Sequence, residues 1–219
     1  MFLSRITDTG RNNKIVFIKN GGEYTPLVRR GIRGIDLRIS GNNNTVKFEL
    51  PIKAERSSIT INCDNSLVEI ASTDRFFDTN IYCDSGRNQV IKIGRGTTIN
   101  SMDVSSGNNA SLVIGKNCMI ATGVNIRTTD SHIIRDRSSG TIANKQRQPL
   151  KIGDNCWIGE NVSIMKNAVL PNNTIVAANA VVAKKFTEEY TVIAGNPAKV
   201  VKSNVVWERL DLCDLGVGI

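Results

Sequence analysis

One histidine, His132, is the first residue to examine for chemistry, because the 219-residue chain contains no other. A neutral imidazole suits the removal of a proton near pH 7, since its ordinary pKa is about 6.5. The same count excludes a zinc site built from three histidines. General-base chemistry at neutral pH therefore depends on His132, and the alternative is that this residue is a solvated loop histidine.

Asp130 stands two residues before His132, in the run Thr-Thr-Asp-Ser-His that begins at residue 128. In an extended segment the side chains of residues i and i+2 point to the same face, so we expect the carboxylate to lie near the imidazole. A carboxylate in that place would fix the tautomer of the ring and stabilise the imidazolium. Backbone carbonyls can also do this, in which case Asp130 would hold the loop instead.

The elements that must position these residues follow from a six-residue repeat. Aliphatic residues recur at every sixth position: Ile152, Ile158, Ile164, Leu170, Val176 and Val182. The residues four positions after each of them are mostly small or β-branched: Cys156, Val162, Ala168, Thr174, Ala180 and Phe186. A period of six excludes an amphipathic helix and a plain alternating strand. It predicts a triangular solenoid in which three short sides make a rung of about 18 residues, with the aliphatic side chains inside.

The same spacing continues upstream, less regularly. Ile114, Ile120 and Ile126 keep the six-residue spacing, as do Ile93 and Ile99 one rung earlier. Before them, Ile- and Val-rich runs are separated by Asn, Gly, Asp and Ser clusters at variable intervals, which we interpret as irregular rungs. We expect an N-terminal cap over residues 1–30, a β-helix domain over 31–202, and a C-terminal tail over 203–219 that is a short helix or a loose segment.

The repeat stops between Ile126 and Ile152, and the intervening stretch is polar and charged. This stretch is predicted to leave the solenoid as a loop over about residues 127–150. Long loops in compact proteins are commonly functional, and this one carries His132.

Composition sets limits on partners and location. Hydrophobic residues make up 40% and charged residues 22% of the chain, as in ordinary globular proteins. The net charge of +8 favours anionic partners, but only 11 residues are aromatic and no nucleic-acid motif is present, so we expect no nucleic acid. Five widely spaced cysteines predict small buried residues rather than disulfides or a metal site. No apolar run is long enough to span a membrane and the N-terminus lacks a secretory pattern, so a cytoplasmic protein is expected.

Three features together resemble the hexapeptide-repeat acyltransferases: the hexads, the segment around His132 and the turn Asn155–Cys156–Trp157–Ile158–Gly159. The run Ala-Gly-Asn-Pro-Ala-Lys-Val-Val-Lys from residue 194 adds to the match. The chain looks most like the sugar and polysaccharide O-acetyltransferases related to maltose and galactoside acetyltransferases, over residues 93–202. The resemblance implies a left-handed parallel β-helix, a homotrimer, and acetyl-CoA bound as the donor between subunits, with no metal.

The resemblance also implies roles for individual residues. His132 would be the general base that removes the proton of a sugar hydroxyl. Asp130 would orient it or bind acceptor hydroxyls, and Asp103 matches a substrate-contacting position, although a turn-stabilising aspartate is the alternative. Trp157 would pack beside the thioester arm and the histidine, or would serve as a contact between subunits.

Further matching positions concern acetyl-CoA itself. Gly159 and Glu160 would line the pantetheine channel, followed by Ala178, Ala183 and Lys184. Glu160 departs from the hydroxyl-bearing residue of close relatives and cannot donate a hydrogen bond when ionised, which puts its part in oxyanion stabilisation in doubt. Ala183 stands where relatives often have Thr, so one polar contact to the ligand is lost. The lysines near the end of the stack would bind the phosphates, or form only a solvated basic face: Lys184, Lys185, Lys199 and Lys202.

The sequence thus predicts an acetyl-CoA-dependent O-acetyltransferase acting on a sugar hydroxyl of a bacterial surface polysaccharide, such as a capsule or O-antigen, or of its precursor. Two alternatives remain open. One is N-acetylation of an amino-sugar nucleotide, although no GxGxxG nucleotide-binding motif opens the chain. The other is a non-enzymatic β-helix that serves as a binding module.

Overall fold

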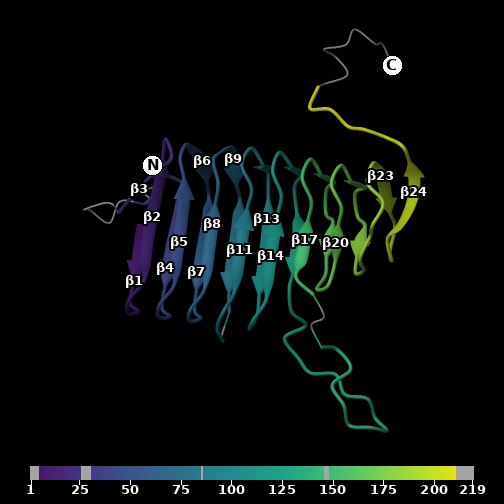
Figure 1. The fold of residues 1–219 in the computed structure, drawn as a ribbon, viewed down its shortest axis with the longest axis horizontal. Helices are drawn as coiled ribbons and strands as arrows, with labels where there is room; N and C mark the ends of the chain where they lie inside the picture. The colour runs from purple at the N-terminus through teal and green to yellow at the C-terminus, as the bar shows by residue number, and fades with distance from the viewer. Residues whose placement is uncertain (1–4, 26–30, 85, 146–147, 211–219) are drawn as a thin grey trace.

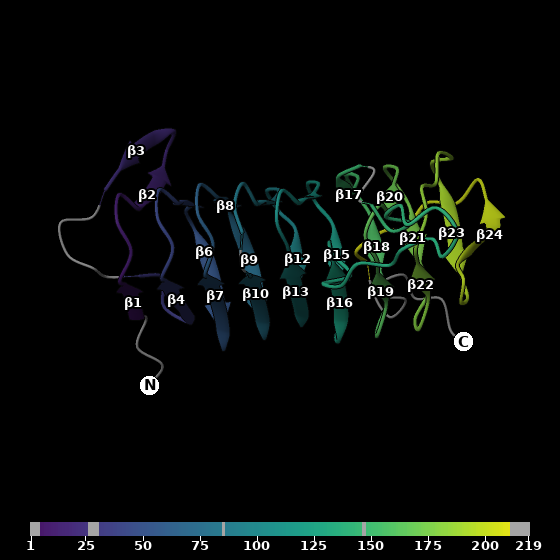
Figure 2. The same cartoon turned by 90° about the horizontal axis from the view of Figure 1, so that it is seen from below.

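The chain folds into a stack of parallel β-coils. The computed structural model describes residues 5–25, 31–84, 86–145 and 148–210, and the regular secondary structure in these ranges consists of strands. Figures 1 and 2 show the coils side by side along one long axis, with the first coil at one end and β23 and β24 at the other. The expected parallel β-helix is confirmed. Within the described ranges no helix is long and apolar enough to cross a membrane.

Three sheets of eight described strands form the sides of the stack, and from β4 to β22 every third strand along the chain joins the same sheet. Sheet A contains β1 (Arg5–Asp8), β4 (Ile35–Ile39), β7 (Ser57–Ile61), β10 (Thr79–Cys83), β13 (Met102–Ser106), β16 (Val124–Arg127), β19 (Ser163–Ile164) and β22 (Val181–Val182). Sheet B contains β3 (Gly22–Tyr24), β2 (Lys14–Lys19), β5 (Thr45–Glu49), β8 (Leu67–Ile70), β11 (Val90–Ile93), β14 (Ser111–Ile114), β17 (Leu150–Ile152) and β20 (Val169–Leu170). Sheet C contains β6 (Ile52–Glu55), β9 (Thr73–Phe77), β12 (Thr98–Ile99), β15 (Met119–Ile120), β18 (Trp157–Ile158), β21 (Ile175–Val176), β23 (Thr191–Ala194) and β24 (Lys199–Ser203).

The coils turn at corners where the backbone adopts the left-handed conformation. Asparagine is the commonest residue with a positive φ, because its short polar side chain tolerates that conformation better than other non-glycine residues do. The asparagines with positive φ at the corners of sheet B are Asn12, Asn43, Asn65, Asn88, Asn109, Asn117, Asn155, Asn167 and Asn173. These asparagines let each coil change direction within a few residues.

Aliphatic side chains fill the interior, as the hexads predict. The first hexad set, which includes Ile152, Ile158 and Ile164, has 0–1% exposure throughout, and the second set is buried too. Cysteines 63, 83, 118 and 156 are free and buried, whereas Cys213 lies outside the described residues. The core is therefore a column of stacked apolar side chains that runs the length of the coils.

At the two ends of the stack the structure differs from the expected boundaries of the cap and the tail. Within the expected cap, β1 and β2 pair in parallel with β4 and β5, so residues 5–8 and 14–19 already belong to the coils. Strand β3 folds back antiparallel on β2. At the other end β24 folds back antiparallel on β23, and the part of the tail at residues 204–210 contains no helix.

Candidate active site

The predicted loop leaves the stack between β16 and β17, at the corner where sheet A meets sheet B (Figure 1). Its outer part is ordered by local hydrogen bonds. A pair of residues, Arg135 and Ile142, forms an antiparallel bridge. The carboxylate of Asp136 accepts hydrogen bonds from the hydroxyls and backbone N–H groups of Ser138 and Ser139, which lower its pKa to about 2.

The backbone on both sides of His132 is held in place. Its N–H donates to the carbonyl oxygen of Asp130 at 2.7 Å, and its own carbonyl oxygen accepts from Nδ2 of Asn144 at 2.8 Å. Ser131 has a φ of +62°, so this segment is a tight turn and not the extended segment we expected. The alternation argument for Asp130 therefore does not apply. His132 itself is exposed, so a ligand can reach its side chain.

Asp130 is bound to two other side chains. Its carboxylate forms an ion pair with Nζ of Lys166 and accepts a hydrogen bond from Nδ2 of Asn144 at 2.8 Å. Burial disfavours the ionised carboxylate, but the hydrogen bonds from Lys166 and Asn144 and the charge of Lys166 outweigh it and lower the pKa of Asp130. No hydrogen bond joins this carboxylate to the imidazole of His132 among the described residues. The arrangement supports the alternative in which Asp130 holds the loop, while its orienting role stays a prediction.

Lys166 and Asn144 are site residues that the sequence reasoning missed. Lys166 lies just after β19 and also donates to the carbonyl oxygen of Asn144 at 2.5 Å, so it connects both ends of the loop to the stack. Spacing along the sequence could not reveal it, because only the stacking of coils brings it beside Asp130. The loop and the stack enclose a hollow of about 220 Å³ whose lining includes His132, Asn108, Thr129 and Ile142.

Asp103 lies outside this hollow's lining. It projects outward from β13 on sheet A and accepts a hydrogen bond from Nδ2 of Asn80 at 2.9 Å. Its register neighbours on the adjacent coils, Asn80 and Asn125, are polar too. The structure therefore gives Asp103 a place in a polar row along sheet A.

Trp157 lies at a different corner from His132. It is the first residue of β18 in sheet C, beside the corner between sheets B and C, and 38% of its surface is exposed. The indole of Trp207, from the C-terminal tail, lies against it with ring centroids 6.2 Å apart. Within one chain His132 and Trp157 thus belong to two separate edges of the triangular stack.

The positions expected to bind acetyl-CoA fall into two groups. Gly159, Glu160 and Ala178 lie on adjacent coils at the corner between sheets C and A. A Cβ atom at Gly159 would come within 2.7 Å of the backbone N of Ala178, so the stacking of coils requires glycine there whatever the ligand. The second group belongs to the last coil and consists of exposed residues: Ala183, Lys184, Lys185, Lys199 and Lys202.

The lysines of the last coil lie on different sides of it. Lys184 follows β22 of sheet A and places its Nζ 5.1 Å from the ring centroid of Phe186. Lys199 and Lys202 belong to β24 in sheet C. In the described ranges, no group of three or more His, Cys, Asp or Glu side chains could hold a metal ion.

The fold and these positions define the class of hexapeptide-repeat β-helix proteins. The sequence pattern described as bacterial transferase hexapeptide (six repeats) matches residues 149–184. A polysialic acid O-acetyltransferase from Neisseria meningitidis is 35% identical over 173 residues, which is 79% of each chain. Another polysialic acid O-acetyltransferase, from Escherichia coli O1:K1 / APEC, is 39% identical over 123 residues, covering 56% of this chain and 39% of that protein.

Solved structures agree over nearly the full length. The crystal structure of the polysialic acid O-acetyltransferase OatWY superposes with a TM-score of 0.75 at 30% identity, covering 96% of both chains. The chain belongs to the hexapeptide-repeat acyltransferase family, in the branch of sugar O-acetyltransferases, and it is an acyltransferase.

Proposed function

We propose that the protein transfers the acetyl group of acetyl-CoA to a hydroxyl of a sialic acid-containing capsular polysaccharide. The observation that carries this proposal is the similarity to two polysialic acid O-acetyltransferases, which for the one from Neisseria meningitidis extends over 79% of both chains. The acceptor named for those relatives is an acidic polymer, and the net charge of +8 favours such a partner. The reaction belongs in the cytoplasm, where acetyl-CoA is formed.

The residues present suit a CoA thioester. Gly159, Ala178 and Ala183 present little side-chain bulk along the last coils, which leaves room for a thin pantetheine chain. The exposed lysines of the last coil supply positive charge for phosphates. Acetyl-CoA provides an acyl group activated as a thioester. The protein needs only to position this group and to accept the proton of the attacking hydroxyl.

His132 acts as the general base in this proposal. Its imidazole takes the proton from the sugar hydroxyl as the hydroxyl oxygen attacks the thioester carbonyl, and the proton is then available for the leaving thiolate. Asn144 and the Lys166–Asp130 ion pair hold the backbone of the turn that presents the ring. A backbone N–H stabilises the oxyanion, since the ionised carboxylate of Glu160 cannot donate a hydrogen bond.

The active site is completed by a neighbouring subunit in a homotrimer. His132 and Trp157 lie at different corners of one chain, so both can face one acetyl group only if they come from two chains. Ile133 and Ile134 next to the base are 63% and 58% exposed, which suits a loop that packs on another subunit.

The test is acetyl transfer from acetyl-CoA to a sialic acid polymer by the wild-type protein and by His132→Ala and His132→Gln. Both variants should lose about 10²–10⁴-fold in rate, the usual contribution of a general base, while acetyl-CoA binding and assembly remain. Turnover at the wild-type rate by either variant would exclude this mechanism. A product whose acetyl group survives mild alkali would instead identify an amide and support the N-acetyltransferase alternative.

A further inference from the structure

The C-terminal strap, which we define as residues 204–210, returns from the end of the stack along the corner between sheets B and C. Its first contact is the N–H of Val205, which donates to the carbonyl oxygen of Tyr190 at 3.0 Å. The indole Nε1 of Trp207 then donates to the carbonyl oxygen of Asn155 at 2.6 Å, two coils further from the end. The strap therefore has defined hydrogen bonds to two coils that are separated by one other coil.

Arg209 fixes the end of the strap to the next two coils, the first with Asn117 and Cys118 and the second with Gly96 and Thr98. Its Nη1 donates to Oγ1 of Thr98 at 2.8 Å, and its Nη2 donates to the carbonyl oxygens of Cys118, Gly96 and Asn117 at 2.8, 3.2 and 3.2 Å. All four acceptors are uncharged. In the described part of the chain no carboxylate forms an ion pair with Arg209, and its Nε makes no hydrogen bond. Its guanidinium carbon lies 5.7 Å from the ring centroid of Trp207. With respect to the described residues the guanidinium thus has no anionic partner and keeps one N–H donor, which suit a carboxylate.

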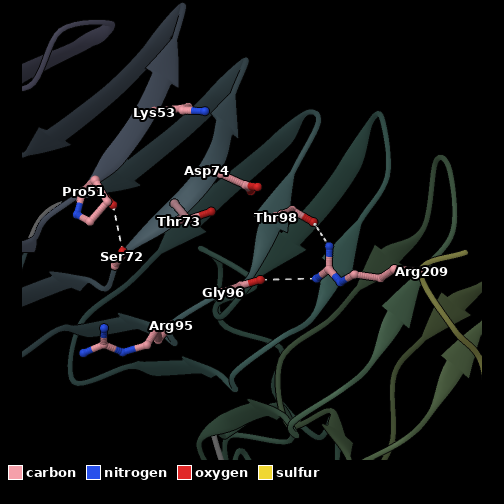
Figure 3. Close-up of a pocket in the computed structure, with 9 residues that line it drawn as sticks. All are labelled: Pro51, Lys53, Ser72, Thr73, Asp74, Arg95, Gly96, Thr98 and Arg209. Carbon is pink, nitrogen blue, oxygen red and sulfur yellow. Dashed lines mark hydrogen bonds between the residues drawn. The ribbon is translucent and has the colours of Figure 1, made fainter.

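A hollow lies on each side of Arg209. The larger one, about 380 Å³, extends toward the earlier coils and is lined by Lys53, Ser72, Asp74 and Thr98 among others (Figure 3). Lys53 is exposed and, among the described residues, forms no ion pair. Arg95 also lines this hollow, but its guanidinium is paired with Glu49. Of the cations that line this hollow, Lys53 and Arg209 are therefore the ones that no described carboxylate pairs with.

The smaller hollow, about 280 Å³, lies between the strap and three stacked corner asparagines, Asn117, Asn155 and Asn173, with Trp207 in its lining. It is close to the lower end of the roughly 300–1,000 Å³ range of ligand pockets, a size for one sugar ring. It also adjoins the exposed indole of Trp157, because the two tryptophan rings are in contact at 6.2 Å.

The lining of the two hollows has the chemistry that recognises an acidic sugar. An indole presents apolar surface to the C–H groups of a sugar ring, and carboxamides both donate to and accept from hydroxyl and acetamido groups. A guanidinium binds a carboxylate with charge-assisted hydrogen bonds. The hydroxyls of Ser72 and Thr98 and the carboxylate of Asp74 offer further partners for sugar hydroxyls.

We propose that the hollows on either side of Arg209 are the acceptor-binding site, each holding one sugar unit of a carboxylated polysaccharide. Arg209 and Lys53 bind carboxylates, and Trp207 and the corner asparagines bind the ring that lies next to Trp157. This site rests on the proposed function, because it names where that acceptor binds. It also gives the first coils a role, since Lys53 and Asp74 come from β6 and β9.

Binding can be measured without turnover by titrating a pentamer of sialic acid into His132→Ala protein by calorimetry. We expect saturable binding that Arg209→Gln weakens about tenfold or more, the effect of losing a hydrogen-bonded charge, and that Trp207→Ala also weakens. A neutral maltopentaose of the same length should not bind. Equal affinity of the parent and the Arg209→Gln protein would overturn the proposal.

Arg209→Gln also removes the anchor of the strap, so a second variant must leave the strap intact. Lys53→Met removes charge from the larger hollow at a side chain that does not contact the strap, and should weaken binding about two- to fivefold, as expected for an exposed ion pair. Lys14→Met, an exposed lysine on β2 of sheet B, is the matched control and should leave affinity unchanged. The proposed site would be contradicted if the Lys53→Met protein bound the pentamer as tightly as its parent. It would also be contradicted if the Arg209→Gln protein lost its assembly but kept its binding per subunit.

Failure of the site and failure of the function give different results. Wild-type protein that acetylates the pentamer, with a KM for the pentamer unaffected by Arg209→Gln, would refute the site and leave the function standing. Pentamer binding that depends on Arg209, without acetylation by the wild-type protein, would refute the function and leave the site standing.

Discussion

The proposed role of His132 as a base requires that the surface loop hold this residue in place, and the backbone at His132 is held on both sides by hydrogen bonds. Asn144 contacts the carbonyl group of His132 and the carboxylate of Asp130, and Lys166 joins the same group from the stack. The conformation of the turn is thus held in part by an ion pair in which the Lys166 side chain is 15% exposed and the Asp130 side chain 38% exposed. Its loss should loosen the turn without unfolding the coils.

The lowered pKa of Asp130 gives this ion pair a predictable pH dependence. A carboxylate whose pKa is lower in the folded protein contributes stability that is present above its ordinary value of about 3.9 and is lost as pH falls through the lowered value. Hydrogen-exchange protection of loop amides, corrected for intrinsic rates, should therefore hold from pH 7 to about pH 4 and fall below it.

Substitutions should reproduce this loss at neutral pH. Asp130→Asn and Lys166→Met should each lower the hydrogen-exchange protection of the loop amides about two- to fivefold at neutral pH, as expected for a partly exposed ion pair. In both variants the further fall in protection below about pH 4, the acid step, should be absent. Lys151→Met, an exposed lysine on β17 just after the loop, is the control and should behave as the wild type. An acid step that persists in Asp130→Asn would assign it to another group.

At the scale of the elements, each two-residue strand places one residue inside and one outside. Ile164 of β19 has no exposed surface, whereas its neighbour Ser163 faces outward and is half-buried. Ile164→Ala should lower the free energy of unfolding by roughly 2–5 kcal/mol, because coils stacked on both sides limit relaxation around the cavity. Ser163→Ala should change it by less than about 0.5 kcal/mol. Urea unfolding at matched protein concentration measures both, and equal effects would contradict the assigned faces.

The coils could be predicted from the six-residue repeat where they are short and regular. Ser163 pairs with Val181, so a late coil takes 18 residues, three times the six-residue repeat. In the first half of the chain Ile35 pairs with Ser57, so a coil takes 22 residues and its strands are up to five residues long. Longer sides with an alternating burial pattern conceal the period of six, and for this reason the early rungs could be recognised only as irregular.

Contacts between distant segments could not be predicted from spacing. Lys166 reaches Asp130 only because the loop folds back on the next coil, and Arg209 reaches Gly96 only because the strap crosses several coils. Neither contact follows from a repeat, since both depend on segments that leave the repeat. The identity of His132 and Trp157 as candidate site residues, in contrast, was available from their types and from the family resemblance.

At the scale of the whole molecule, a triangular stack separates two residues that the proposed reaction requires. His132 is at the corner between sheets A and B, and Trp157 is beside the corner between sheets B and C. In a cyclic trimer the same two surfaces meet at every interface, so one chain's loop can face the next chain's tryptophan three times. This geometry makes subunit mixing a direct test of the composite site.

The expected result is that two inactive variants restore activity when mixed. His132→Ala and Trp157→Ala trimers should each be nearly inactive. The two variants are mixed in equal amounts, unfolded and refolded together. A Trp157→Ala chain still has His132, and a His132→Ala chain still has Trp157. A functional site forms at each interface where these two intact residues face each other. Random assembly gives about one quarter of the wild-type number of sites. If both residues served the same site within one chain, every chain would carry one defect and the mixture would remain inactive. Activity of the mixture after refolding, compared with the two variants mixed without refolding, decides between these arrangements.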